Sequence, residues 1–515
     1  MGEGSAGPQR ERRGTYYDAL TLGVFAAMNS ALLGRNTWPP ASVRERWEEI
    51  EFFEALRESD EEDLRQHASV RWNAPYIVNP LPRLISRASA NLLFGEPAIF
   101  TPGDQADAQA LDDLITANDL DSELLRAAMI SSSEGEVWGK IVVQPSLLDY
   151  PIIEWVSAEY VIPHFQGRFV LGATFVTEWK QSATETLRLL ETYEAGRITN
   201  ELYRGSPTSI GVKVALDSFS GTAGKPDEQI TGIDSPLVAF VPNSLGSDGT
   251  RGISDYRGLE QRFLALNEAI TVGQQNLKLA GRKRALVDAA YLDANGQMPD
   301  GDDVYVRQDT DSVMGDAAKP VQMIDYAYDS APVTAWVDHL IDSTLTFAGV
   351  APQSVGRSID GGAISGTALK LKMSHSLIEA AGKGRHFDRA LGRLLRFAAL
   401  LDSRPTTQGG FGRRWIAPDQ EATVMRSDGL LRDDTEAAET LSKLVNAEVI
   451  STEEAVRWWR PDWTPEQVDE EVARITGGSL QGDQPISIST PRPPIPQISD
   501  QGPPEAEGQP PNLTG

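Results

Sequence analysis

Two long stretches in the second half of the chain carry apolar residues at helical spacing. In the first, residues 253–280, the apolar positions step by three and four, which places them on one face of an α-helix. These positions are Tyr256, Leu259, Phe263, Leu266 and Ile270. The second stretch, residues 331–349, carries Val337 and Leu340 and has Pro332 in its first turn. Such narrow apolar seams are typical of helices that pack against neighbouring helices.

The segments that border these helices carry their own signals. Ser254 follows a glycine-rich loop and is expected to cap the first helix. Between the two helices lies a small, aspartate-rich insert with short β-like runs. Its DGDD turn at 300–303 lacks the spacing and the closing glutamate of a calcium loop, so a solvated turn between strands is expected.

From Val137 to about residue 245 the pattern changes to alternation and short apolar runs. VWGKIVV, EYVIPHF and RFVLGATFVTEW are typical of strands, and glycine-bearing connections such as FQGR favour antiparallel pairing. Helical patterns at 43–66 and 107–134 precede these strands. The first half of the chain is therefore predicted to be mixed α+β.

After the second seam helix, residues 357–373 read RSIDGGAISGTALKLKM, a glycine-rich stretch that runs into a basic helix. The helical pattern continues to about residue 401, and GKG at 382–384 predicts a break in it. Arginines at 385, 389, 393 and 396 share one face, opposite the apolar residues Phe387, Leu391, Leu394 and Ala398. The partner of this basic face is either an acidic surface of the same fold or oligomer, or DNA phosphate.

The last hundred residues and the start of the chain carry patterns of their own. Residues 405–431 read as a short β excursion, and three capped helical patterns follow up to about residue 476. The remainder is rich in Gly, Pro, Gln and Ser, a composition typical of disorder. Near the start, an apolar run interrupted by Gly23 and Asn29 indicates an amphipathic helix rather than a signal peptide. With no run of about 18 apolar residues elsewhere, no membrane partner is expected.

Composition excludes several kinds of chemistry. The 515 residues carry a net charge of −27, include no cysteine, and have five scattered histidines. Disulfides, thiolate nucleophiles and cysteine zinc sites are thus excluded, and no HExxH, GxxxxGK[ST] or GxSxG motif occurs. We predict no catalytic residue, no metal and no cofactor, and we do not expect an enzyme. The acidity argues against a protein that grips DNA through many phosphates, but not against a surface past which DNA slides.

Five motifs follow one another in a specific order. They are ANLLFGEP, VSAEYVIPHF, PNSLGSDGTRGISDYRGLEQRFLALNEAI, ISGTALKLKM and NAEVISTEEAVRWW, with the helix–insert–helix segment before the fourth. This order resembles the portal proteins of tailed bacteriophages, the head-to-tail connectors, over roughly residues 70–475. The resemblance implies an α+β portal fold with wing, long-helix stem, small α/β clip and helical crown, assembled as a ring with a central channel.

The resemblance also implies a division of the chain. The wing would comprise residues 1–245 together with the helices and short β excursion of 365–431. The stem helices would be 246–281 and 329–349, and the clip would be 282–328. The candidate tunnel loop is 350–364, the crown helices are 432–476, and the disordered tail is 477–515.

Three groups of residues are expected to serve these parts. Candidates for the tunnel loop and DNA channel are Gln353, Ser354, Arg357, Ser358, Asp360, Gly361, Gly362, Lys370 and Lys372. Candidates for the clip, where motor and connector proteins would dock, are Asp293, Asp300, Asp302, Asp303 and Arg307. The stem seam would consist of Tyr256, Leu259, Phe263, Leu266, Ile270, Val337 and Leu340.

The function implied is that of a structural ring, usually of twelve subunits, at one capsid vertex of the virion. Double-stranded DNA would be packaged and later ejected through it without sequence recognition, and assembly would occur in the host cytoplasm. The implied partners are copies of the chain, the major capsid and scaffolding proteins, the large terminase subunit and head-to-tail connector or adaptor proteins. The charge fits, because a negatively lined channel does not hold a moving duplex.

Two other functions stay open from the residues. Another phage head structural or adaptor protein is disfavoured by the helix–insert–helix segment 253–349. A soluble acid/base enzyme would need a deep pocket that holds a carboxylate with a strongly raised pKa.

Overall fold

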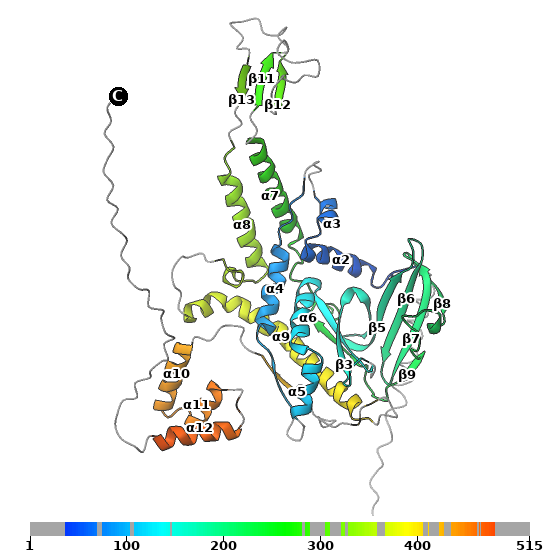
Figure 1. The fold of residues 1–515 in the computed structure, drawn as a ribbon, viewed down its shortest axis with the longest axis vertical. Coiled ribbons are helices and arrows are strands. Elements are labelled where there is room, and N and C mark those ends of the chain that lie inside the picture. Colours follow the sequence, from blue (N-terminus) through cyan, green and yellow to red (C-terminus); the bar gives the residue numbers. More distant parts are fainter. Residues whose placement is uncertain are drawn as a thin grey trace, which may run out of the picture. The chain divides into compact units, whose positions relative to one another are not determined.

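The fold is known from a computed structural model, and it mixes helices and sheets (Figure 1). The described residues are 37–68, 75–102, 108–144, 147–280, 284–288, 304–308, 321–324, 328–357, 366–404, 410, 412, 422–426, 434–460, 463 and 465–478. They fall into two compact units, residues 1–431 and residues 432–515, which are described separately. The α+β class predicted from the sequence is confirmed. None of the helices in the described ranges is long and apolar enough to cross a membrane.

Short helices lead into the sheets of the first unit. They are α2 (Arg44–Glu58), α3 (Glu61–Gln66), α4 (Leu81–Phe94), α5 (Ala108–Ala117) and α6 (Leu120–Glu134). Each of the two helical segments predicted here is divided in two. Between α2 and α3, Ser59 is left-handed, and the Asp60 carboxylate accepts the backbone N–H groups of Glu62 and Asp63. This capping residue starts a new helix that apolar periodicity alone does not separate from the first.

An antiparallel sheet of six strands follows. Its strands are β4 (Val161–Gln166), β5 (Phe169–Lys180), β6 (Thr186–Glu194), β7 (Arg197–Ser206), β8 (Ser209–Val214) and β9 (Glu228–Ile230). The order is β4-β5-β6-β7-β8, with β9 also paired to β7. Gly196 takes a φ of +84° in the two-residue turn between β6 and β7, a conformation that favours glycine. The antiparallel pairing predicted from such turns is present.

A second sheet contributes to the largest hydrophobic core. It has the order β10 (Val238–Pro242), β2 (Glu136–Val142), β3 (Ile152–Ser157), and both pairings are antiparallel. Trp138 of β2 is fully buried in this core. Side chains of α6 and of the long helix α9 (Gly366–Asp402), among them Leu124 and Leu394, complete it. The core therefore joins segments from both ends of the first unit.

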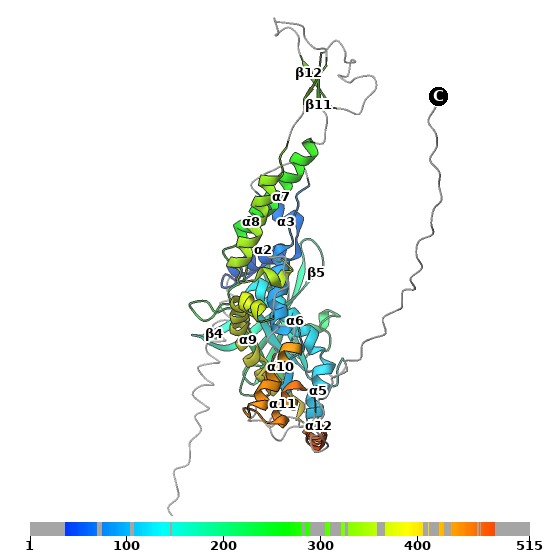
Figure 2. The ribbon, with the colours of Figure 1, turned by 90° about the vertical axis from the view of Figure 1, so that its left-hand side faces the viewer.

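The two seam helices run side by side (Figures 1 and 2). They are α7 (Glu260–Ala280) and α8 (Ala331–Phe347), and the chain between them forms β11 (Arg284–Asp288), β12 (Val304–Gln308) and β13 (Val321–Ile324). Strand β11 pairs in parallel with β12 and antiparallel with β13. The β-like insert predicted between the helices is thus a small mixed sheet.

The start of α7 differs from the prediction. The helix begins at Glu260, so residues 246–259 are not part of it. Ser254 does not cap the helix: its hydroxyl donates to the Ser133 carbonyl and accepts the N–H of Tyr256 within a tight turn. Its hydrogen bonds hold the approach to α7 against α6.

The predicted break in the basic helix is wrong, because α9 is continuous through residues 382–384. Glycine weakens a helix by about 1 kcal/mol relative to alanine but does not end it. A Cβ atom at residue 384 would overlap the guanidinium group of Arg426, which is held by the Asp388 carboxylate at 2.6 Å and 3.0 Å. Arg426 directly follows β14 (Thr423–Met425), which pairs with β1 (Ile99–Thr101). Gly384 is therefore a point of close approach.

The faces of α9 agree in part with the prediction. Phe387, Leu391, Leu394 and Ala398 are buried as expected. Arg385 and Arg389 are exposed, whereas Arg393 and Arg396 are half-buried, and the Arg393 guanidinium lies 5.2 Å from the ring centroid of Phe397. The basic stripe is therefore open to solvent only in its first half.

The second unit contains helices α10 (Asp434–Asn446), α11 (Thr452–Trp459) and α12 (Pro465–Gly478). Helix α11 contacts both of the others. The Ser451 hydroxyl accepts the N–H of Glu454 at 3.1 Å and caps α11. The three helices predicted from their caps are present. The tail was predicted from residue 477, but α12 includes residues 477 and 478, and residues 479–515 lie outside the described residues.

Candidate functional site

The stem-seam residues all belong to one hydrophobic cluster. Tyr256, Leu259, Phe263, Leu266 and Leu340 are buried in it, and Ile270 and Val337 are partly buried against it. The same cluster includes Phe53 and Leu56 of α2 and Leu81 and Ile85 of α4. The seam therefore packs largely against other helices of its own chain, and Tyr256 and Leu259 reach the cluster from the segment before α7.

Polar contacts and a glycine fix α7 in place. The Asn267 side-chain oxygen accepts the N–H of Asn79 at 2.8 Å, and the Thr271 hydroxyl accepts the N–H of Ile77 at 2.9 Å. A Cβ atom at Gly273 would lie 3.1 Å from the Val333 side chain of α8. The two helices are thus in close contact one turn above the cluster.

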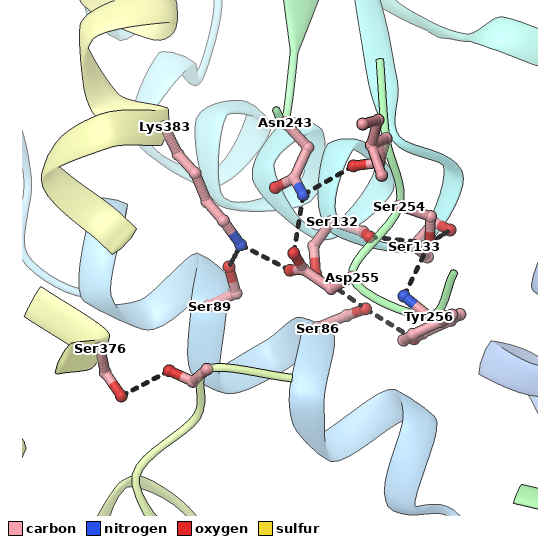
Figure 3. A network of polar contacts seen from close by, with 12 residues as sticks. Ser86, Ser89, Ser132, Ser133, Asn243, Ser254, Asp255, Tyr256, Ser376 and Lys383 are labelled. Carbon is pink, nitrogen blue, oxygen red and sulfur yellow. Dashed lines mark hydrogen bonds and ion pairs between the residues drawn. The ribbon is translucent and has the colours of Figure 1, made fainter. Parts of the chain in front are cut away.

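The first part of the candidate tunnel loop is anchored at both sides. The N–H of Ala351 donates to the Ser376 hydroxyl of α9 at 2.7 Å. This hydroxyl, drawn in Figure 3, donates to the Gly349 carbonyl at 2.7 Å. Arg357 forms ion pairs with Asp338 and Asp342 of α8, at 3.0 Å and 3.2 Å. The segment up to residue 357 is therefore held where α8 and α9 meet.

The other loop and channel candidates are distributed as follows. Gln353 and Ser354 are half-buried in a short 3-10 turn, Pro352–Val355, and Lys370 and Lys372 are exposed near the start of α9. Ser358, Asp360, Gly361 and Gly362 lie outside the described residues. The structure thus brings Arg357 together with α8, and it places the two lysines on the adjoining helix.

Of the clip candidates, one belongs to a described strand. Arg307 lies in β12, and Asp293, Asp300, Asp302 and Asp303 lie outside the described residues. Within the described part of the chain, no group of three or more histidine, aspartate or glutamate side chains could hold a metal ion.

A buried polar network that the sequence did not reveal joins α9 to the segment before α7. The Lys383 ammonium lies 2.5 Å from the Asp255 carboxylate and 2.7 Å from the Ser89 hydroxyl of α4 (Figure 3). The same carboxylate accepts hydrogen bonds from Ser132 of α6 and from the Asn243 amide, both at 2.7 Å. The side chains of Lys383 and Asp255 are only 9% and 11% exposed. Three side chains, those of Lys383, Ser132 and Asn243, thus converge on one carboxylate, and Ser89 joins through Lys383.

The network continues to the stem cluster. The Ser132 hydroxyl lies 3.2 Å from the Ser86 hydroxyl, which is hydrogen-bonded to the phenol of Tyr256 at 2.6 Å. The Tyr256 hydroxyl also donates to the Pro82 carbonyl at 2.7 Å. Because these groups are buried and saturated by one another, they are suited to fixing the position of α9 relative to the start of α7.

Two glutamate carboxylates have pKa values raised to about 7. Burial raises the pKa of Glu134 to about 7, although hydrogen bonding from Ser157 and the nearby Arg57 oppose the shift. Burial also raises the pKa of Glu159 to about 7, and repulsion from Glu54 and Glu51 adds to it. Glu134 accepts the Ser157 hydroxyl at 2.6 Å and the N–H of Ala158 at 3.2 Å. Its hydrogen bonds are those of a structural group that ties α6 to the end of β3.

Neither of these carboxylates lines the cavity of about 490 Å³ between α5, α6 and β3. In that cavity, the Asn118 side chain accepts the N–H of Ile153 and donates to the Pro151 carbonyl, and Arg126 donates to the Trp155 carbonyl. These side chains cover the free edge of β3, as proteins commonly do at sheet edges. The cavity polar groups thus have structural partners.

The Glu134 pKa predicts a pH effect. Because its folded-state value, about 7, exceeds its ordinary value of 4.5, the folded state binds the extra proton between these pH values. The protonated Glu134 side chain therefore makes its full contribution to the free energy of unfolding below about pH 4.5, and this contribution is lost as the pH rises through 7. We expect Glu134→Gln to gain stability relative to the unmodified chain, on the order of 3 kcal/mol between pH 5 and pH 8, in urea denaturation.

The quantity to measure is the difference in free energy of unfolding between Glu134→Gln and the unmodified chain at each pH. Burial lowers the pKa of His164 to about 4, so His164 makes both proteins more stable as the pH rises, and the difference removes this effect. Glu185→Gln is the control for net charge, since Glu185 forms an exposed pair with Arg204. A Glu134→Gln difference that stays constant from pH 5 to pH 8 would contradict the assignment.

Comparison with known proteins gives one family match. The family model described as "Phage portal protein, SPP1 Gp6-like" matches residues 265–476, which include most of α7, the insert, α8, α9 and the helices of the second unit. No curated protein matches the chain. A solved chain from the "Neck of native GTA particle computed with C12 symmetry" is similar over 74% of this chain and 89% of that chain, with 14% identity and a TM-score of 0.37. Residues 265–476 are therefore similar to the phage portal protein family, which agrees with the resemblance found in the sequence.

Proposed function

We propose that copies of this chain, twelve in number, form a closed ring at one vertex of a phage capsid and that double-stranded DNA passes through its central channel. The observation that carries this proposal is the match of the portal family to the segment in which α7 and α8 flank the small sheet β11–β13. Packaging and ejection of the genome would both use this channel, and the chain itself would perform no chemistry.

The charge of the chain supports a conduit. Twelve copies would carry a net charge of about −300, given −27 for each chain. A channel in such a ring repels phosphate, and a duplex that releases few counterions to the protein is not held in place. The side chains of Lys370 and Lys372, near the start of α9, are exposed and would be local positive charges in this negatively charged ring.

The parts of the fold receive roles on this proposal. Helices α7 and α8 would form the stem, and the sheet β11–β13 would form the clip against which the terminase motor and later the connector proteins dock. Residues 350–364 would form the tunnel loop, with Arg357 holding its first part to α8. Helices α10–α12 would form the crown. Capsid and scaffolding proteins would contact the outer parts of the ring in the virion.

The proposal predicts the oligomeric state. Purified chain, at high protein concentration, is expected to form rings of about twelve subunits with an axial channel in negative-stain or cryo-electron micrographs. Coexpression with capsid and scaffolding proteins is the matched condition, because some rings close only with their assembly partners. A stable monomer or dimer under both conditions would overturn the proposal.

A further inference from the structure

An exposed stripe runs along α9. Leu371 and Ile378 are 76% and 70% exposed. They are seven residues apart, close to two helical turns, and therefore share one face. The same face continues through Gly382 to the exposed Arg385 and Arg389. The stripe is thus apolar in its first half and basic in its second half.

Gly382 is not explained by the fold of the single chain. Among the described residues, no atom lies within 4 Å of the position that a Cβ atom would take. Glycine inside a helix costs about 1 kcal/mol relative to alanine. A bare backbone in the middle of an exposed face does, however, admit the close approach of another helix. This differs from Gly384, where Arg426 fills the space.

A second apolar surface lies on α8. Trp336 and Phe347 are 52% and 65% exposed, and their separation of eleven residues is close to three turns. His339 lies between them and stacks on Trp336, with ring centroids 5.6 Å apart. Because the seam residues of α7 and α8 are largely occupied within their own chain, contacts between copies must use other surfaces such as this one.

Charge favours a second copy of the chain as the occupant of the α9 stripe. The basic half of the stripe belongs to a chain of net charge −27. Helices α2 and α3 carry several exposed acidic residues, namely Glu45, Glu48, Glu51, Glu58, Glu61 and Glu62, of which Glu58 and Glu61 also form ion pairs with arginines of the same chain. A ring is built from two different patches that fit each other, so a basic stripe and acidic faces on one chain are complementary between neighbours.

We propose that the α9 stripe of Leu371, Ile378, Gly382, Arg385 and Arg389 is one side of the interface between adjacent copies of this chain. This inference rests on the proposed ring and identifies the surface through which it closes. Leu371 and Ile378 would bury apolar surface against the neighbouring copy, and Gly382 would allow a helix of that copy to come close. Arg385 and Arg389 would form ion pairs with its acidic residues.

Substitution of the apolar half tests the interface. The double variant Leu371→Glu with Ile378→Glu is expected to lower the ring fraction at least about tenfold in native mass spectrometry, because it places two charges in a contact that must become buried. The matched control is Val212→Glu with Ile230→Glu, since these residues of β8 and β9 are 66% and 68% exposed. The control should assemble normally. Normal assembly of both variants would overturn the inference.

The absence of cysteine allows a second, independent measurement. The variant Ile378→Cys carries a single thiol, whose maleimide labelling is expected to slow at least about tenfold in the ring relative to unassembled chain. Val212→Cys should label at the same rate in both states. Equal labelling of position 378 in both states, or slowing only when duplex DNA is added, would overturn the inference. A wild-type chain that forms no ring, either alone or coexpressed with capsid and scaffolding proteins, would instead refute the proposed function.

Discussion

Replacement of Lys383 by methionine is expected to lower the free energy of unfolding by about 3–5 kcal/mol, because the Asp255 carboxylate would stay buried without its cation. Methionine keeps most of the apolar length of lysine, so the loss would be electrostatic rather than a cavity effect. Ser132 and Asn243 would still donate to the carboxylate, but neither carries charge. Urea denaturation followed by tryptophan fluorescence measures the difference.

A double variant separates the charge from the packing. Lys383→Met combined with Asp255→Asn removes both charges and should recover most of the stability lost in the single variant. Lys278→Met, on an exposed position of α7, is the surface control and should change stability by less than about 0.5 kcal/mol. A cost below about 1 kcal/mol for Lys383→Met would show that the pair is not needed to hold α9.

The position of this pair gives its loss a wider consequence. Asp255 precedes α7 by a few residues, Lys383 lies within α9, and Ser89 and Ser132 belong to α4 and α6. Ser376 of α9 also accepts the N–H of Ala351, which lies in the first part of the candidate loop. Weakening the network should therefore loosen the support of the stem and of the loop together, which amide hydrogen exchange in α9 would report.

Regular elements with a long or repeated pattern were predictable from the sequence. The steps of three and four in α7 and α8 and the alternation in β3 and β7 reflect burial of one face, so the order of apolar and polar residues is enough to predict them. The burial of Phe387, Leu391, Leu394 and Ala398 followed for the same reason. Each of these features depends on residues close together in sequence.

The failures depend on contacts between distant residues. GKG was expected to interrupt α9, but Lys383 finds Asp255 128 residues earlier in the chain, and Gly384 makes room for Arg426. Ser254 was expected to cap α7, but its hydroxyl binds Ser133 of α6. No local pattern contains these partners, so glycine and serine were read by their average local behaviour.

The candidate site was predictable to a similar extent. The seam residues were identified by spacing, and the structure gathers them in one cluster. That α2 and α4 would cover much of the seam could not be seen, because the acidic helix 43–66 reads as a solvated face until its apolar residues, such as Phe53 and Leu56, are placed. The only sign of the buried Lys383–Asp255 network in the sequence was the GKG motif at 382–384, a lysine between two glycines within a helical pattern.

Shortening residues 358–364 to a brief proline-containing segment is expected to leave ring assembly intact and to abolish DNA packaging. On the proposed function these residues project toward the channel, and their glycines permit motion and close approach that proline removes. Residues 350–357 stay unchanged in this variant, so the ion pairs of Arg357 with Asp338 and Asp342 and the Ala351–Ser376 hydrogen bond are retained. Native mass spectrometry measures the ring, and nuclease-protected DNA per particle measures packaging.

A second shortened loop provides the control for this change. Residues 182–184 form an exposed turn between β5 and β6, and their removal alters the length of a connection remote from α8 and α9. This control should both assemble and package. If the 358–364 variant packages DNA as well as the control, then the loop does not act on the duplex and the channel role of this segment is wrong. If the 358–364 variant fails to assemble, these residues serve the contact between copies instead, because the anchors at Arg357 and Ala351 still hold residues 350–357.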